Sequence, residues 1–312
     1  MSIINRKAHI TFLFLAFILV SQVLFAQQEA QFTQYIYNPT TLNPGYTGSR
    51  LSTMLYFQNR QQWIGLEGAP KNLFLNAQTF FEKSKTGLGF EVQSNAIGPI
   101  TRNIVSFNYS YHLKISDDES IGMGLKFSNL FLNSNFDLLS LRDQNDPFFT
   151  NNIENRYNPN FGVGFFYYTD KYYVGLSVPS LFKTNYYNTS SPNELQFEFN
   201  NINIYLMAGY VFEIGRSIRV KPASLVRYLN GSFILENSIS AQLLNSITIG
   251  ASYRNGVSLS ALAGIQLTNS LFFGYSYDSN IGVFNLNGNS HEIFIRMELL
   301  DLKTRIWNAR FF

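Results

Sequence analysis

Few residues of this sequence could do covalent or metal chemistry. Its 312 residues include 3 histidines and no cysteine, which excludes disulfides, zinc–thiolate sites and thiol nucleophiles. His291 and Glu292 are neighbours, and a strand would point them to opposite faces, where they could not bind one ion together. No second histidine follows four residues later, so the helical zinc-protease motif is absent. The sequence predicts neither a metal site nor a cofactor.

A serine–histidine pair is the second candidate for chemistry. Ser110 and His112 would lie on one face of a strand, about 7 Å apart. We expect that separation to be too long for the hydrogen bond between a nucleophile and its base. The glycine pairs within 87–89 and 162–164 are followed by no helix, so they are not phosphate-binding loops but strand glycines that face a lumen. The sequence therefore predicts a protein that is not an enzyme.

The elements that carry these residues are predicted to be strands with one apolar face. From about residue 51, apolar side chains alternate with polar or small ones, as in 105–113, 121–128 and 257–267. Successive side chains on a strand point to opposite faces, so only one face is hydrated. Only 14% of the residues are charged, against about 25% in soluble domains. This favours a membrane barrel, with a soluble sandwich as the alternative.

The alternation predicts an all-β fold, a transmembrane antiparallel up-and-down β-barrel of about 14 strands. The expected strands are 51–59, 71–82, 86–94, 102–115, 120–131, 160–169, 171–178, 200–212, 217–228, 233–243, 246–254, 256–267, 271–278 and 291–300. With this count, the long connections 60–70, 132–159, 179–199 and 279–290 all fall on the outer side, as in known outer-membrane barrels. Aromatic residues near strand ends, at 165–168, 172, 173, 275 and 277, are typical of the lipid–water interface.

Both ends of the chain depart from this pattern. Residues 1–26 combine two basic residues with a short apolar run, which predicts a signal peptide and therefore export to the cell outer membrane. Residues 27–50 lack alternation and predict a short strap or plug at the periplasmic mouth, with a disordered leader as the alternative. The barrel would comprise 51–312, in which 301–312 form either strand or periplasmic tail.

The first long outer loop is the predicted partner-binding site, because Trp and Arg are favoured anchors at protein interfaces. Trp63 could equally anchor the barrel at the membrane interface. The loops 132–159 and 179–199 could bind a secreted partner or cover the lumen. The candidate partner-binding residues are Arg60, Trp63, Gly65, Glu67, Pro70 and Lys71 of the first loop, with Asn43 and Pro44 of the N-terminal segment.

Four charged residues are expected to face a water-filled lumen. They are Lys126, Glu292, Arg296 and Glu298. The last three share one face by parity, so their charges can pair. The formal net charge of the whole chain is only +3, and this balance gives no basic face of the kind that nucleic acid requires.

Several segments, in order along nearly the whole chain, resemble a known family. They are 31–38 (QFTQYIYN), 42–49 (LNPGYTGS), 60–71 (RQQWIGLEGAPK), 95–99 (NAIGP), 221–222 (KP), 274–278 (GYSYD), 290–293 (SHEI) and 308–312 (NARFF). The set resembles the PorP/SprF family, outer-membrane proteins of the type IX secretion system of Bacteroidota. Departures are Gly45, where the family more often has Ala, and Asn308-Ala309, where it more often has Ser-Pro.

The resemblance implies an outer-membrane protein without catalytic activity or cofactor. It would assist secretion or surface anchoring of a partner protein, such as a gliding-motility adhesin. It would also contact the periplasmic ring proteins of the secretion machinery. A solute channel for small or hydrophobic molecules is the alternative function, because fourteen strands surround a lumen that is either plugged or open.

Overall fold

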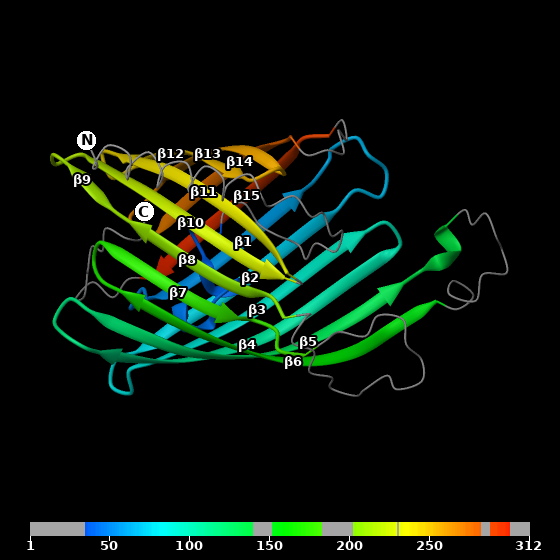
Figure 1. The fold of residues 1–312 in the computed structure, drawn as a ribbon, viewed down its shortest axis with the longest axis horizontal. Helices are drawn as coiled ribbons and strands as arrows, with labels where there is room; N and C mark the ends of the chain where they lie inside the picture. The colour runs from blue at the N-terminus through cyan, green and yellow to red at the C-terminus, as the bar shows by residue number, and fades with distance from the viewer. Residues whose placement is uncertain (1–34, 140–151, 183–201, 230, 282–287, 300–312) are drawn as a thin grey trace, which may run out of the picture.

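A computed structural model describes residues 35–139, 152–182, 202–229, 231–281 and 288–299. Its strands form one antiparallel sheet in which β10 also pairs with β11, so the sheet closes into a barrel (Figure 1). Closure joins the two ends of the sheet, which matters in lipid because an unpaired backbone group there costs several kcal/mol. The expected 14-stranded antiparallel barrel is confirmed, with one short additional strand, β9.

The strands have the following bounds. They are β1 Thr53–Gln61, β2 Lys71–Phe81, β3 Thr86–Ile97, β4 Ile100–Lys114, β5 Ser120–Ser134, β6 Ile153–Tyr168, β7 Tyr172–Val178, β8 Ile204–Tyr210, β9 Phe212–Ile214, β10 Ile218–Leu229, β11 Ser232–Leu243, β12 Ile247–Arg254, β13 Ser258–Gln266, β14 Leu271–Asn280 and β15 Ser290–Leu299. Three 3₁₀ helices, η1 Pro39–Thr41, η2 Pro44–Tyr46 and η3 Phe136–Leu138, are the only helices in the described ranges. None of these helices has the length and apolar character needed to cross a membrane.

The two faces of the sheet differ as the alternation predicts. On β13, Leu259 is 51% exposed on the outer face, whereas Ser260 beside it is 4% exposed and faces the lumen. The same pattern holds on β4, where Phe107 and Tyr109 are exposed and Asn108 is buried. An apolar outer band around an interior that contains many polar side chains is the arrangement that a bilayer stabilises.

The strands on the outer side are longer than expected in two hairpins. β3 and β4 continue to a turn at Gly98-Pro99, where the sequence predicted a loop from 95 to 101. β6 begins at Ile153 instead of 160 and has 16 residues, whereas about 9–11 cross a bilayer. The β5–β6 hairpin therefore rises beyond the barrel rim (Figure 1). Both faces of strands that project beyond the membrane meet water. Apolar and polar residues therefore need not alternate there, and the sequence pattern could not reveal the extra length of these strands.

The strand expected at 200–212 is interrupted. β8 ends at Tyr210 and β9 begins at Phe212, and both pair with β10, at Ala223↔Gly209 and Val220↔Phe212. Pro222 of β10 lies opposite the break, and a proline has no N–H to give to a ladder.

Aromatic residues near the strand ends separate into two groups. Tyr167, Tyr172 and Tyr210 face outward, with the Tyr167 and Tyr172 hydroxyls 3.3 Å apart and the rings of Tyr172 and Tyr210 stacked. Those that are buried inside the barrel instead are Phe166, Tyr168 and Tyr173. The prediction that these three belong to the membrane interface is wrong, because inward parity places them in an apolar core within the lumen.

Some expectations fall outside the described residues. The signal peptide (1–26), the first part of the N-terminal segment (27–34) and the whole tail (301–312) lie there, as do 140–151, 183–201 and 282–287 of the outer connections. The boundaries of these segments remain predictions.

Candidate functional site

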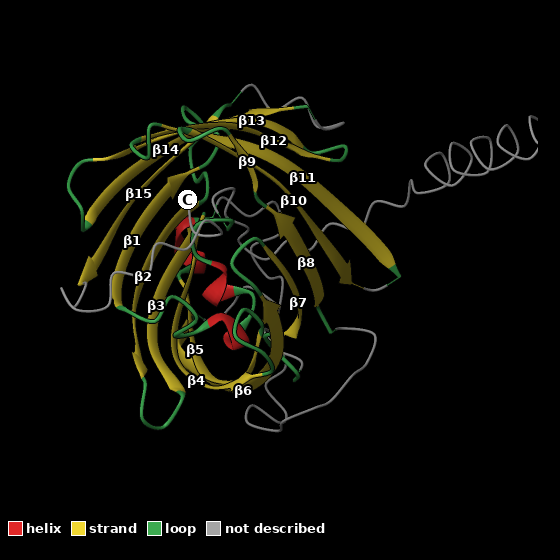
Figure 2. Ribbon diagram, turned by 90° about the vertical axis from the view of Figure 1, so that its left-hand side faces the viewer, coloured by secondary structure: helices red, strands yellow, loops and turns green. Residues whose placement is uncertain are grey.

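Residues 35–50, called the plug below, lie inside the barrel. Figure 2 shows the helical turns within the ring of strands, and residues 35–40 and 43–49 are buried. Two Asn-Pro steps shape the plug. The side-chain Oδ1 of Asn38 accepts from the backbone N–H of Thr40 at 3.4 Å, and that of Asn43 accepts from Gly45 at 2.9 Å. An asparagine N-cap followed by proline favours a helical turn.

Hydrogen bonds join the plug to strands far away in the sequence. They are Asn43 Nδ2 to Phe165 O (2.9 Å), Ser177 Oγ to Leu42 O (2.7 Å), Gly48 N to Gln78 Oε1 (2.9 Å) and Lys126 Nζ to Thr41 O (3.3 Å). They come from β6, β7, β2 and β5. Because several strands hold one short segment, it has a defined position in the lumen.

Ser110 and His112 form a clamp on the plug. The Thr47 carbonyl lies 2.5 Å from Ser110 Oγ and 2.8 Å from His112 Nε2. Ser110 Oγ and His112 Nε2 are themselves 3.0 Å apart, so the prediction that they lie too far apart for a hydrogen bond is wrong. The expected distance applies to their Cα atoms, which the strand rise separates. The two side chains approach each other because both contact the Thr47 carbonyl.

This clamp does not have the proton arrangement of a catalytic dyad. A carbonyl oxygen only accepts, so His112 Nε2 carries a proton and donates it to Thr47, as does the Ser110 hydroxyl. His112 Nδ1, 2.8 Å from the Tyr168 hydroxyl, then accepts in the neutral ring. A general base needs a free lone pair toward the serine proton, and here Nε2 is protonated.

Glycines on the lumen face form a seat for the plug. A Cβ at Gly122 would clash with the backbone of Gly45, and one at Gly124 would clash with the backbone of Pro44. A Cβ at Gly87 would clash with the backbone carbonyl of Thr47, whereas one at Gly164 would clash with the side chains of Asn43 and Pro44. The strand glycines thus have a role that sequence reasoning missed, since they allow two backbones to approach closely.

Aromatic rings of the barrel wall also hold the plug. The Tyr37 ring lies 4.8 Å from that of Phe294 and 5.6 Å from that of Phe272, measured between centroids. Tyr46 meets Phe166 edge-on at 5.3 Å. Buried aromatic pairs of this kind add about 0.5–1.5 kcal/mol each beyond the burial of their area.

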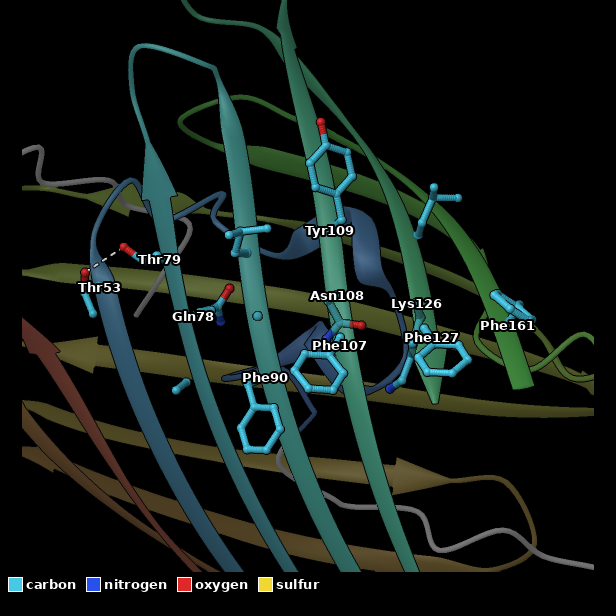
Figure 3. A pocket seen from close by; sticks show the side chains of 14 residues that line it. Thr53, Gln78, Thr79, Phe90, Phe107, Asn108, Tyr109, Lys126, Phe127 and Phe161 are labelled. Carbon is cyan, nitrogen blue, oxygen red and sulfur yellow. Dashed lines mark hydrogen bonds between the residues drawn. The ribbon is translucent and has the colours of Figure 1, made fainter. Parts of the chain in front are cut away.

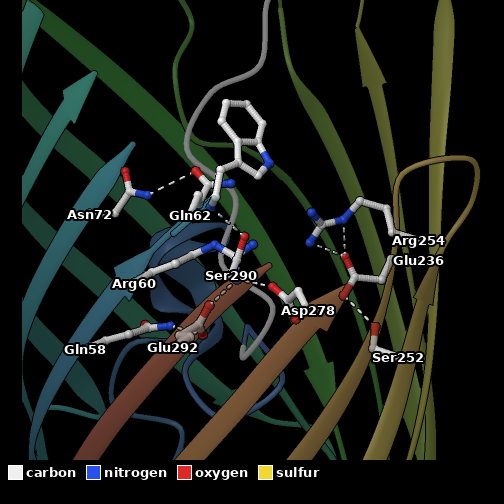
Figure 4. A network of polar contacts seen from close by, with 11 residues as sticks. Gln58, Arg60, Gln62, Asn72, Glu236, Ser252, Arg254, Asp278, Ser290 and Glu292 are labelled. Atoms are coloured by element: carbon white, nitrogen blue, oxygen red, sulfur yellow. Dashed lines mark hydrogen bonds and ion pairs between the residues drawn. The ribbon is translucent and has the colours of Figure 1, made fainter. Parts of the chain in front are cut away.

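A layer of ion pairs crosses the outer half of the lumen (Figure 4). Arg60 of β1 pairs with Asp278 of β14 and, at 2.8 Å, with Glu292 of β15. Arg254 of β12 pairs with Glu236 of β11 at 2.8 Å. Arg60, a candidate partner-binding residue, is 2% exposed and points inward, because β1 continues to Gln61 and inward parity includes residue 60.

The four charges expected in the lumen all point into it. Lys126 Nζ lies 2.7 Å from Glu91 Oε2. Glu292 belongs to the outer layer, whereas Arg296 Nε lies 3.0 Å from Glu298 Oε1. Glu298 also pairs with Arg50 of the plug. Salt bridges therefore connect the plug to the last strand as well.

The first outer loop has a fixed conformation. Trp63 N donates to Ser290 Oγ at 3.3 Å, and Ile64 N donates to Asn289 O at 3.0 Å. On the other side, Gly98 N donates to Gly68 O at 2.8 Å. The loop is therefore tied to the connection before β15 and to the β3–β4 turn.

The candidate residues of this loop have different environments. Gly65, Glu67 and Lys71 are exposed, Trp63 is partly exposed with a φ of +47°, and Pro70 is buried. A positive φ is strained for tryptophan. Asn43 and Pro44 are buried in the plug and do not lie at the outer surface. Sequence reasoning missed Ile64 and Leu66, which are exposed apolar residues.

Periplasmic turns present exposed charges. In the turn between β4 and β5, Lys114 Nζ lies 2.8 Å from Asp117. This hydrogen bond from Lys114 lowers the pKa of the Asp117 carboxyl. Within the described ranges, no cluster of three or more His, Asp or Glu residues could hold a metal ion.

Comparisons with known proteins agree with this geometry. The profile of the type IX secretion system membrane protein PorP/SprF family matches residues 24–297. None of the curated proteins matches the chain. Omp33, an outer-membrane protein of Acinetobacter baumannii, is similar in structure, with a TM-score of 0.50 and 8% identity over 80% of this chain and 98% of Omp33. The monoaromatic hydrocarbon channel CymD has a TM-score of 0.48 and 9% identity over 86% of this chain and 92% of CymD. The similarity to Omp33 shows a barrel fold alone.

Proposed function

Because the chain belongs to the type IX secretion system membrane protein PorP/SprF family, we propose that it is a non-enzymatic outer-membrane component of type IX secretion. In this role it assists secretion or surface anchoring of a partner protein, such as a gliding-motility adhesin of Bacteroidota. It also contacts periplasmic proteins of the secretion machinery.

The observation that carries the proposal is the occupied lumen. The plug is bonded to β2, β4, β5, β6 and β7 and packs against rings of β14 and β15. A channel needs a continuous water path, and a segment buried at this level narrows any such path. The plugged barrel therefore supports a scaffold that binds proteins over the alternative of a solute channel.

The first outer loop is the proposed contact for the secreted partner. It presents Ile64 and Leu66, each about half exposed, on a loop held from both sides. Exposed apolar residues on a rigid loop lose little conformational entropy on binding. Trp63, Glu67 and Lys71 flank them, while Arg60, Pro70, Asn43 and Pro44 would support the loop and lumen from within.

Affinity purification of the tagged barrel from outer membranes tests this proposal. We expect one large secreted protein and periplasmic secretion proteins to co-purify with the native chain. The double substitution Ile64→Asp/Leu66→Asp should reduce the secreted protein at least tenfold. Ile281→Asp, at another exposed apolar position on the outer side, is the matched control and should retain it.

Conductance in planar bilayers tests the alternative function. A plugged barrel should show no steady ion current at the level expected for an open pore. Steady conductance by the native protein, together with no co-purifying secretion protein, would contradict the proposal and favour a channel.

A further inference from the structure

The outer wall of β1 to β6 contains a hollow of about 630 Å³ (Figure 3). Small residues line it on β1 to β3, where Thr53, Ala77, Thr79 and Gly89 lie. Large apolar residues line it on β3 to β6. Its exposed lining residues, such as Phe90, Phe107 and Leu125, place the hollow on the lipid-facing side. Its lining also includes the inward-facing residues Gln78, Asn108 and Lys126, of which Gln78 and Lys126 hydrogen-bond the plug.

Four phenylalanines form a ladder along this hollow. The register places Phe90 opposite Phe107, Phe107 opposite Phe127, and Phe127 opposite Phe161. The rings of Phe90 and Phe107 are 5.1 Å apart, and those of Phe127 and Phe161 are 5.2 Å apart. Cross-strand aromatic neighbours support each other, so the ladder is a preformed apolar surface.

A pair of hydroxyls lies at the other end of the hollow. Thr53 Oγ1 and Thr79 Oγ1 are 2.8 Å apart and hydrogen-bonded (Figure 3). Two hydroxyls carry two protons, and the bond between them uses one. The second proton can be donated to an acceptor. Burying a hydroxyl in hydrocarbon without a partner is unfavourable, so this end of the hollow suits a ligand with an acceptor oxygen.

The hollow rises through the membrane from the periplasmic side. Thr79 is two residues from Phe81, where β2 meets a short turn, and Thr53 begins β1. Phe161 is seven residues from Tyr168, where β6 meets the same side. The side with short turns is periplasmic in barrels of this kind. The hydroxyl pair therefore lies near the periplasmic interface and the ladder extends toward the bilayer centre.

We propose that this hollow is a binding site for one diacyl phospholipid of the periplasmic leaflet. The threonine pair donates a hydrogen bond to an ester carbonyl, and one acyl chain lies across the phenylalanine ladder. The threonine pair would lie at the depth of the ester groups of such a lipid, and the phenylalanine ladder at the depth of its acyl chains. This site is independent of the proposed role in secretion.

Native mass spectrometry of the full-length protein, released from detergent after addition of phosphatidylethanolamine, tests the site. We expect one retained phospholipid on the native barrel. Thr53→Val/Thr79→Val keeps the shape but removes the donors, and should weaken retention about fivefold. Ala77→Phe fills the hollow and should abolish retention.

Matched controls separate this site from general lipid contact. Thr101→Val removes a threonine hydroxyl from β4, and Phe233→Ala removes an exposed ring on β11; both should retain the lipid as the native chain does. A phospholipid with a photoactivatable acyl chain should label β3 to β5 of the native chain. Equal retention by every variant, labelling spread around the whole barrel, or a protein in place of lipid on this wall would overturn the proposal.

Discussion

The two sides of the lumen wall solve the same packing problem differently. On β3, β5 and β6 the inward positions next to the plug include Gly87, Gly122, Gly124 and Gly164, and the backbone and side chains of the plug fill the space. On β1, β11, β12, β14 and β15 the inward positions carry Arg60, Glu236, Arg254, Asp278 and Glu292, and these side chains fill it themselves.

This difference shows that alternation decides only which residues face inward. The size of the inward residue decides what occupies the lumen. Small residues require a filler from elsewhere in the chain, whereas long charged residues require partners of opposite charge across the strands. Substitutions on each side should therefore fail for different physical reasons.

The largest expected effect is on the charged side. Arg60→Met removes the cation that pairs with Asp278 and Glu292, both buried. Two carboxylates then share a dry environment, and breaking a buried pair in this way costs about 3–5 kcal/mol. The midpoint of urea unfolding in detergent micelles measures the change. Adding Asp278→Asn and Glu292→Gln should recover part of the loss. No recovery would mean that packing, and not charge, is what Arg60 contributes.

A second prediction compares the inside of the barrel with its outside on β13. Leu259→Arg places a charge against lipid and should cost about 2–4 kcal/mol. Ser260→Arg, one residue later, enters the polar lumen and should cost less. Folding yield into liposomes, followed by heat-modified migration on gels, measures both. Equal losses for the two variants would contradict the assignment of Leu259 to the lipid face and Ser260 to the lumen face.

The third prediction concerns the glycine side. Gly124→Val places a side chain where the Pro44 backbone lies, and overpacking of this kind costs about 1–3 kcal/mol. Limited proteolysis should then cut residues 35–50, which the native barrel protects. Ser260→Val, a small inward residue on the charged side, is the control and should leave the plug protected. Protection of the plug in Gly124→Val would show that the seat is not needed.

Much of the fold follows from the sequence because lipid restricts the solutions. Hydrocarbon outside and polar groups inside impose a period of two on every crossing strand, so the strand count and the inward position of Lys126, Glu292, Arg296 and Glu298 could be predicted. Arg60 could not, because ending β1 at residue 59 left it in a loop. If the predicted strand had continued by one residue, the alternation of inward and outward residues would have placed Arg60 inside the barrel.

The plug illustrates what local sequence cannot reveal. Its composition predicted a segment at the barrel mouth, and its two Asn-Pro steps favour turns. Its position, however, depends on contacts between distant residues, such as Asn43 with Phe165, which are 122 positions apart. The break between β8 and β9 has a similar origin, because Pro222 lies on the neighbouring strand β10.

The smallest expected effect tests the clamp that joins the plug to β4. His112→Ala removes one of the two donors to the Thr47 carbonyl and the partner of the Tyr168 hydroxyl. A lost hydrogen bond to a buried group costs about 1–3 kcal/mol, and the remaining Ser110 donor should keep the loss near the lower end. His291→Ala is the control, since that ring bonds Tyr275 away from the plug.

A double-mutant cycle with Ser110→Ala tests whether the two donors act together. The loss of stability in the double variant should differ from the sum of the two single losses, because both donors act on one oxygen. Additive losses would mean that Ser110 and His112 stabilise the wall separately, and that the plug is held by its glycine seat and aromatic contacts alone.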